Sequence, residues 1–275
     1  MFLSKEQPIG VFDSGVGGLT VANAIRNLLP SEKIIYFGDT AHLPYGDKSS
    51  DAIRKYSIGI TEFLLQKNCK TIVIACNTAS AHAFITVKDF LKKNAPEVEV
   101  INVIEPAVEM VTMKKKFAKV GIIGTKGTIR SEMYPIKIKE KDTNMEVVSL
   151  ATPLLVPMIE EGFIYDDISN AIIRSYLSND SLKSIDALIL GCTHYPIIKN
   201  QIRKFFDFQL TVIDSSQMVA AKLKEVLNKN NLLCTSEITT IAHEFYVSDY
   251  TDYFKKIAEM FFDDEVDLIK LNIWN

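Results

Sequence analysis

Two of the four cysteines in this 275-residue chain end an apolar run and precede small polar residues. Cys76 lies in IVIACNTA (72–79), and Cys192 lies in LILGCTHYP (188–196). A thiol has an ordinary pKa of about 8.5, so modest tuning gives a usable fraction of thiolate near neutral pH. Two thiols on opposite sides of one carbon could remove a proton from one face and return a proton to the other. The pattern therefore predicts a two-base proton transfer that inverts a stereocentre.

Each of these cysteines has a titratable residue that could tune it. Asp13 ends the strand that we expect to neighbour the strand of Cys76, and His194 lies two residues after Cys192. A carboxylate or an imidazole beside a thiol can accept its proton or set its charge. The two remaining cysteines lack such neighbours and are expected to be small apolar core residues: Cys69 and Cys234.

Further polar residues near the predicted strand ends could bind a small molecule. Asn77, Thr78 and Thr193 directly follow the two cysteines and are placed to hydrogen-bond the ammonium or carboxylate of an amino acid. Tyr45 and Gly46 lie in a loop rich in Gly and Pro. Loops at strand ends commonly form pocket walls, so we expect this loop at the site.

Two more stretches leave their role open. The glycine-rich DSGVGG (13–18) runs into a predicted helix, whose free backbone amides could hold an anion, although a plain glycine turn is the alternative. The stretch matches neither the dinucleotide-binding motif nor the P-loop motif. Glu160 and Glu161 fit either a solvated helix end or a pocket wall.

Apolar runs alternate with helical spacing along the chain, which predicts parallel strands joined by helical crossovers. We also expect one helix over 129–138 and a solvated acidic tail over 263–267. The predicted strands are 9–12, 33–37, 71–75 and 98–104, and then 119–123, 146–150, 184–190, 210–213 and 243–247.

The pattern repeats itself. Similar apolar runs begin at Ile9 and at Val120. Cys76 and Cys192 are separated by nearly the same number of residues, and so are the apolar runs that end at 104 and 213. This predicts an α/β protein of two similar parallel-sheet domains that face each other across an active-site cleft, since ligands of such sheets bind at the carboxyl ends of the strands. The expected domains are 1–104 plus 214–275, closed by the C-terminal segment, and 105–213.

The composition is that of an ordinary globular protein, with 47% hydrophobic and 24% charged residues. A net charge of −3 gives no basic footprint for nucleic acid. No apolar run approaches the roughly 18 residues of a membrane span, and scattered free thiols indicate a reducing compartment. We therefore expect a cytoplasmic protein with neither nucleic-acid nor membrane partners, and no CxxC pair suggests a metal site.

Seven ordered motifs, covering nearly the whole chain, resemble those of the glutamate racemase family of bacterial cell-wall synthesis. The resemblance implies two α/β domains with the active site between them. It also implies interconversion of L- and D-glutamate without pyridoxal phosphate or metal. The motifs are DSGVGGLTV (13–21), YFGDTAHLPYG (36–46), ACNTASA (75–81), VIEPA (103–107), EEG (160–162), GCTHYP (191–196) and HEFY (243–246).

The resemblance assigns roles residue by residue. It makes Cys76 and Cys192 the acid/base thiols, with Asp13 and His194 as auxiliary groups, and Glu161 stays a candidate pocket residue. Substrate-binding residues by the same resemblance are Asp13, Ser14, Tyr45, Gly46, Asn77, Thr78, Thr193 and His194. The chain departs from the family at His42-Leu43, where an arginine is more usual, and over 248–253.

Three alternatives stay open at this point. A racemase acting on aspartate differs in substrate by one methylene, which a pocket discriminates by only about 1–3 kcal/mol. A cysteine hydrolase or amidotransferase would use one thiol as a nucleophile with His194 as base. A binding module of the same fold would hold glutamate without reaction. The sequence also leaves open whether the protein is a homodimer.

Overall fold

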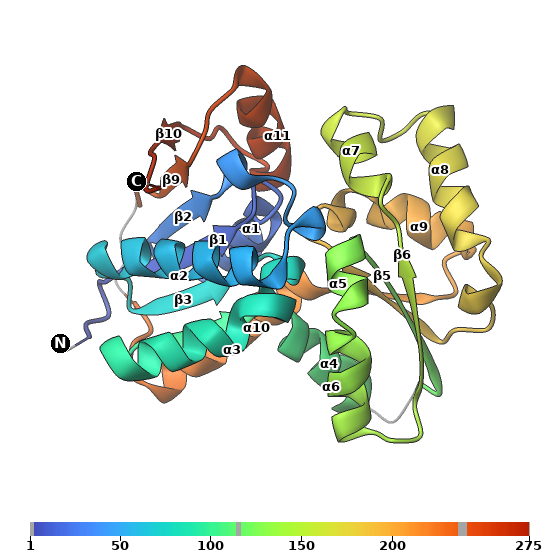
Figure 1. Cartoon of the computed structure of the whole chain (residues 1–275), viewed down its shortest axis with the longest axis horizontal. Helices are drawn as coiled ribbons and strands as arrows, with labels where there is room; N and C mark the ends of the chain where they lie inside the picture. The colour runs from blue at the N-terminus through green and yellow to red at the C-terminus, as the bar shows by residue number, and fades with distance from the viewer. Residues whose placement is uncertain (1–2, 114–116, 236–240, 275) are drawn as a thin grey trace. The chain divides into compact units, whose positions relative to one another are not determined.

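The computed structural model describes residues 3–113, 117–235 and 241–274, which form two compact units (Figure 1). One unit consists of Met1–Val103 and Ser216–Asn275, and the other of Ile104–Ser215. Each unit contains one sheet whose strand pairs are all parallel. The fold class expected from the alternation of strands and helices, two parallel-sheet α/β domains, is confirmed.

The first unit holds a six-stranded sheet of order β10-β9-β2-β1-β3-β4. The three central strands are buried at every position, as the continuous apolar runs of strands covered on both faces require. The strands are β1 (Ile9–Asp13), β2 (Ile34–Gly38), β3 (Thr71–Ile74), β4 (Glu99–Asn102), β9 (Glu244–Val247) and β10 (Leu268–Lys270).

Helices cover this sheet, with α2 packed against α3 and α1 against α11. Two of them begin at capping hydroxyl groups, because Ser49 accepts from the Ala52 amide and Thr251 accepts from the Phe254 amide. The helices are α1 (Leu19–Leu28), α2 (Ser50–Gln66), α3 (Asn77–Asn94), α10 (Ser215–Lys229) and α11 (Asp252–Phe262), with short 3-10 turns η1 (Thr40–His42) and η2 (Tyr45–Asp47).

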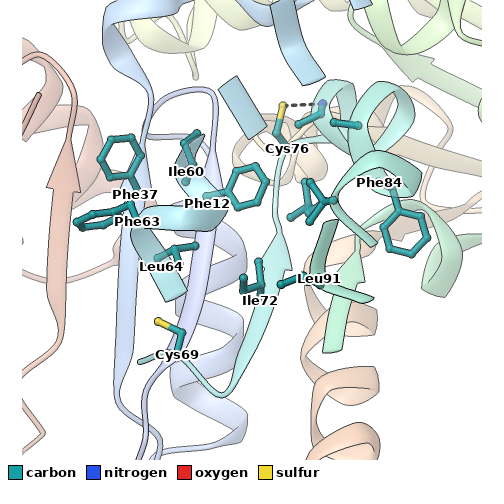
Figure 2. Packing of buried hydrophobic residues seen from close by; sticks show 14 of the residues in the cluster. Phe12, Phe37, Ile60, Phe63, Leu64, Cys69, Ile72, Cys76, Phe84 and Leu91 are labelled. Atoms are coloured by element: carbon teal, nitrogen blue, oxygen red, sulfur yellow. Dashed lines mark hydrogen bonds between the residues drawn. The ribbon is translucent and has the colours of Figure 1, made fainter. Parts of the chain in front are cut away.

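A buried apolar cluster lies between β1–β3 and the helices α2 and α3 (Figure 2). Phe12, Phe37 and Ile72 point from the strands toward Leu64 of α2 and Leu91 of α3. Cys69 packs among these side chains at the lower end of β3 in the view, as the core role predicted for it requires. Cys76 lies at the opposite, carboxyl end of the same strand.

The second unit repeats the strand order of the first. Its sheet runs β6-β5-β7-β8, which matches β2-β1-β3-β4 strand for strand and supports the duplication predicted from sequence spacing. The strands are β5 (Lys119–Gly124), β6 (Glu146–Ala151), β7 (Ala187–Gly191) and β8 (Thr211–Asp214). The helices are α4 (Ile104–Met113), α5 (Lys126–Arg130), α6 (Met133–Lys141), α7 (Leu155–Glu160), α8 (Asp167–Leu177) and α9 (Lys199–Phe205), with 3-10 turns η3 (Asp180–Leu182) and η4 (Tyr195–Ile198).

Three local expectations are wrong. The single helix over 129–138 is two helices, because Glu132 adopts a left-handed φ of 53° between them. The strand expected over 98–104 ends at Asn102, and Pro106 lies in the first turn of α4, where a missing amide donor is tolerated. The tail over 263–267 is not wholly solvated, since Val266 is buried, and it leads into β10, which was not predicted.

Within the residues that the structure describes, no helix is both long and apolar enough to cross a bilayer.

Candidate active site

Cys76 lies between the end of β3 and the start of α3. Its Sγ accepts a hydrogen bond from the Ala79 amide at 3.4 Å, the contact dashed in Figure 2, so the thiol caps an 18-residue helix. The positive end of a helix dipole favours the thiolate form of a cysteine. The side chain is buried, at 5% exposure.

Strand pairing places two predicted site residues beside Cys76. β1 pairs with β3, and the Ala75 amide donates to the Phe12 carbonyl at 2.8 Å, so Asp13 and Ser14 follow at the same sheet edge. The Cys76 thiol lies 3.6 Å from the Ser14 hydroxyl oxygen. This confirms that the strand of Asp13 neighbours the strand of Cys76.

The electrostatic surroundings of Cys76 favour the neutral thiol. Burial, followed by the negative charge of Asp13, raises the pKa of Cys76 well above its ordinary value. Hydrogen bonds from the Ala79 amide and Ser14 act in the opposite direction but do not reverse the shift. Cys76 therefore rests as a protonated group that can donate a proton.

The glycine-rich loop after β1 is shaped around Asp13. The Gly18 amide donates to Asp13 Oδ2 at 2.8 Å, so this amide serves the chain's own carboxylate. A Cβ on Gly18 would lie 2.5 Å from the Asp13 Cβ, closer than any side chain tolerates. The glycine is therefore required for the close approach of the loop to Asp13, and the predicted anion site at this amide is replaced by an internal contact.

The remaining predicted residues of the first unit lie near the same edge. Asn77 and Thr78 are buried in the first turn of α3. Tyr45 begins η2, and its buried hydroxyl donates to Asp39 Oδ2 at 2.7 Å. Burial, and next the charge of Asp39, raise the pKa of Tyr45 well above its ordinary value, so this hydroxyl stays a neutral donor. Gly46 follows within η2.

Cys192 follows β7 in the second unit and is part of a relay of three side chains. The Cys192 Sγ lies 3.7 Å from His194 Nδ1, and His194 Nε2 lies 2.9 Å from Oε1 of Glu160, the last residue of α7. Both Cys192 and His194 are buried, and Thr193 between them is buried too.

The relay favours a positively charged His194. Burial lowers the pKa of His194, but contacts with Cys192 and then Glu160 outweigh burial and raise it to about 10. The charged ring of His194 thus lies 3.7 Å from the sulfur of Cys192. The two thiols therefore have opposite surroundings: the anionic Asp13 lies beside Cys76, and the cationic His194 lies beside Cys192.

The sequence left Glu160 open between a solvated helix end and a pocket wall, and only Glu161 was kept as a candidate pocket residue. The structure shows that Glu160, the first glutamate of the Glu-Glu-Gly stretch, contacts His194. Glu161 lies exposed after the end of α7, so the pocket role predicted for it stays a prediction.

The structure thus assembles two half-sites, each within one unit. Asp13, Ser14, Tyr45 and Cys76 lie in the first, and the Cys192–His194–Glu160 relay lies in the second. That both act on one substrate stays a prediction. Among the described residues, no cluster of three or more His, Cys, Asp or Glu side chains is arranged to hold a metal ion.

Comparison with known proteins identifies relatives along nearly the whole chain. The profile of the Asp/Glu/hydantoin racemase family matches residues 19–223. The glutamate racemase of Chlorobaculum parvum is 43% identical over 269 residues, covering 98% of this chain and 97% of the relative.

Solved structures give the same result. The glutamate racemase of Francisella tularensis, in complex with D-glutamate, is 41% identical with a TM-score of 0.90 and coverage of 98% of both chains. The glutamate racemase of Thermus thermophilus, in complex with β-chloro-D-alanine, is 37% identical with a TM-score of 0.86 and coverage of 98% of both chains. An aspartate racemase homologue from Pyrococcus horikoshii shares the fold at 19% identity, with a TM-score of 0.53, over 81% of this chain and 99% of its own.

Proposed function

Because the chain belongs to the Asp/Glu/hydantoin racemase family, we propose that it interconverts L- and D-glutamate by proton transfer between two thiols. The product D-glutamate would supply peptidoglycan synthesis in the cytoplasm. The observation that carries the mechanism is the opposite surroundings of the two strand-end cysteines, Cys76 beside Asp13 and Cys192 beside His194. A two-base reaction needs one deprotonated and one protonated group at the start of each turnover.

The mechanism assigns a task to each half-site. In one direction the Cys192 thiolate removes the α-proton of glutamate while Cys76 delivers its own proton to the opposite face. In the reverse direction Cys76 removes the α-proton, with Asp13 beside it as the group that can accept the proton of the thiol. Cys192 then delivers a proton to the opposite face, and His194 carries the positive charge beside it. Both directions require Cys76 and Cys192 to flank one Cα, which a glutamate-bound structure tests directly.

Substrate binding would rest on the polar residues around each thiol. We propose that Ser14, Asn77 and Thr78 in the first unit and Thr193 in the second hydrogen-bond the amino and carboxyl groups of glutamate. Tyr45 and Gly46 would form the pocket wall next to Cys76. Each of these residues lies within two residues of a strand end or in the first turn of a helix. Side chains whose backbone is fixed in this way form a pre-organised site.

Isotope exchange tests the proposal. Incubating the protein with L-glutamate in deuterated water should give D-glutamate with deuterium at the α-carbon. Absence of exchange from both enantiomers contradicts the proposed function. Side-by-side turnover of aspartate measures the substrate preference, which we expect to favour glutamate because the relatives at 37–43% identity are glutamate racemases.

Cysteine variants test the two-base assignment. In Cys76→Ala and Cys192→Ala, net racemisation should be lost, because a single base cannot serve both faces of the carbon. The remaining thiol should still exchange the α-hydrogen of one enantiomer only, and the two variants should retain opposite enantiomers. Retention of the same enantiomer by both variants contradicts the assignment, whereas full activity in one variant and none in the other supports a single catalytic thiol.

The relay of Cys192, His194 and Glu160 also favours a second candidate, a cysteine hydrolase with a thiol nucleophile. That reaction passes through a covalent acyl-enzyme and leaves Cys76 idle. Intact-mass measurement during turnover, together with the activity of Cys76→Ala, separates the two candidates. We expect no acyl adduct and a loss of turnover in the variant.

A further inference from the structure

Asp39 is a fully buried carboxylate that gathers side chains from its own loop and from two distant segments of the first unit. Its Oδ2 accepts from the Tyr45 hydroxyl at 2.7 Å, and its Oδ1 accepts from the Ser248 hydroxyl at 2.8 Å. Oδ1 also accepts from the Trp274 indole Nε1 at 2.9 Å. His42 Nδ1 lies 2.9 Å from both oxygens. An ionised carboxylate has about four acceptor positions, so these partners use its capacity fully.

The indole of Trp274 is seated in a fitted position on this cluster. Its ring packs edge-on against His42, with ring centroids 5.0 Å apart, and against Tyr56 of α2, at 5.4 Å. Gly59 of α2 leaves the space that the ring fills, because a Cβ there would lie 2.7 Å from the indole. The tail segment, residues 271–274, is anchored to β9 by the Leu271 amide, which donates to the Val247 carbonyl at 2.9 Å.

The same cluster is joined to the loops around Cys76. The Asp39 amide donates to the Asp13 carbonyl at 3.0 Å. Leu43 packs over Gly15 of the glycine-rich loop, at 3.0 Å from the position of a Cβ on that glycine. Asp39 therefore connects the backbone next to Asp13 with the hydroxyl of Tyr45.

A second set of contacts holds the loop from the other side. The Ala41 amide donates to the Ser248 hydroxyl oxygen at 2.8 Å, and the Thr40 hydroxyl donates to the Asp249 carbonyl at 2.6 Å. Ser248 and Asp249, which directly follow β9, therefore fix η1. His42, the last residue of η1, stacks on Tyr56 with ring centroids 3.9 Å apart.

From these contacts we propose that Asp39 and Trp274 are positioning residues that hold Tyr45 and Gly46 in the substrate-binding conformation. The inference rests on the proposed function, in which Tyr45 and Gly46 form the pocket wall. If the loop occupies its binding conformation for only a fraction of the time, the apparent affinity for substrate falls to that fraction of its intrinsic value. Saturating substrate shifts the loop into its binding conformation. The perturbation should therefore raise KM and leave kcat largely unchanged.

Three variants perturb the cluster in different ways. Trp274→Phe keeps an aromatic ring but removes the donor to Asp39. Gly59→Ala places a methyl group where the indole lies, while alanine favours the α2 helix itself. Asp39→Asn removes an acceptor and the charge. We expect KM for glutamate to rise about threefold to tenfold in the first two variants and further in Asp39→Asn, with kcat changed less than about threefold.

Coupling gives a readout that a merely structural role would not produce. Because Gly59→Ala and Trp274→Phe act on the same contact, the double variant should show about the KM of the stronger single variant rather than the product of both. Lys270→Ala is the matched control, since it removes an exposed ion pair with Asp249 next to the same tail segment and should leave KM unchanged. Melting temperatures of all variants identify any loss of folding.

The outcomes separate the inference from the proposed function. A wild-type protein that neither racemises nor binds glutamate overturns both. An active wild type with unchanged KM in folded Trp274→Phe and Gly59→Ala variants overturns the positioning role alone. A raised KM with kept kcat and non-additive coupling supports it, and if Asp39→Asn fails to fold, these two milder variants still decide the question.

Discussion

Replacing Glu160 by Gln should shift the high-pH limb of racemisation to lower pH. In the structure Glu160 Oε1 lies 2.9 Å from His194 Nε2, and the contacts of His194 with Cys192 and Glu160 raise its pKa to about 10 despite burial. Gln keeps the shape and a hydrogen-bonding oxygen but removes the negative charge. The proton of the Cys192–His194 pair should therefore be lost at lower pH.

The size of the shift follows from the contact. A hydrogen bond to a charged group contributes about 1.5–3 kcal/mol, which corresponds to about 1–2 pKa units. The pKa of His194 in the variant should then lie at about 8–9. At pH 9 the wild-type imidazole is about nine-tenths protonated, whereas a group with a pKa of about 8 is about one-tenth protonated. We expect kcat/KM at pH 9 to fall by up to about tenfold, with a change below about twofold at pH 7.

The assay is the initial rate of racemisation followed by circular dichroism from pH 6 to 10. Because the enantiomers have equal free energies, kcat/KM must give the same pH profile from either one, which provides an internal check. Glu140→Gln is the matched control, since its side chain is exposed in the same unit and its profile should be that of the wild type. An unmoved high-pH limb in Glu160→Gln, or an equal shift in the control, refutes the relay.

Three further predictions concern stability. Lys70 is fully buried and bonds Glu32 Oε2 at 2.6 Å, so Lys70→Met, which leaves that carboxylate unpaired, should destabilise the protein by about 3–5 kcal/mol in urea denaturation. The pKa of His194 is raised to about 10, so its contribution to stability is complete below pH 6.5 and is lost as the pH rises toward 10. The free energy of unfolding, measured by denaturation at pH 7 and pH 10, should therefore fall less in His194→Gln than in the wild type. Hydrogen bonding, chiefly to Lys33, lowers the pKa of Glu244 to about 2. The stability that this contact contributes above pH 4.5 should therefore be lost as the pH drops toward 2. The loss should be on the order of 1 kcal/mol, because the pair is partly solvated, and Glu244→Gln should not show it.

The central strands could be predicted from the sequence because their signal is local. The runs that became β1, β3, β5 and β7 are buried almost throughout, so each is apolar at consecutive positions and bounded by glycine or polar residues. Element boundaries at which local sequence signals conflict could not be predicted. The break at Glu132 depends on one left-handed residue, which the apolar spacing over 129–138 does not reveal.

Part of the candidate site could also be predicted from the sequence. Asp13 ends β1, and Cys76 and Cys192 lie within two residues of the ends of β3 and β7. Parallel strands bring their carboxyl ends to one edge of a sheet. Their use in catalysis stays a proposal. The contacts of Glu160 with His194 and of Asp39 with Trp274 were not predicted, because each joins residues that lie far apart along the chain.

The sequence alone determined the central sheet strands, the repeat and the two thiols near strand ends, since each is encoded within a few neighbouring residues. Only the tertiary structure decided that Glu160 contacts His194, 34 residues away, and that the Trp274 indole donates to Asp39, 235 residues away. It also decided the opposite surroundings of the thiols. A charge state depends on burial and on every charge within a few ångströms, and these are properties of the packed chain rather than of any short stretch of it.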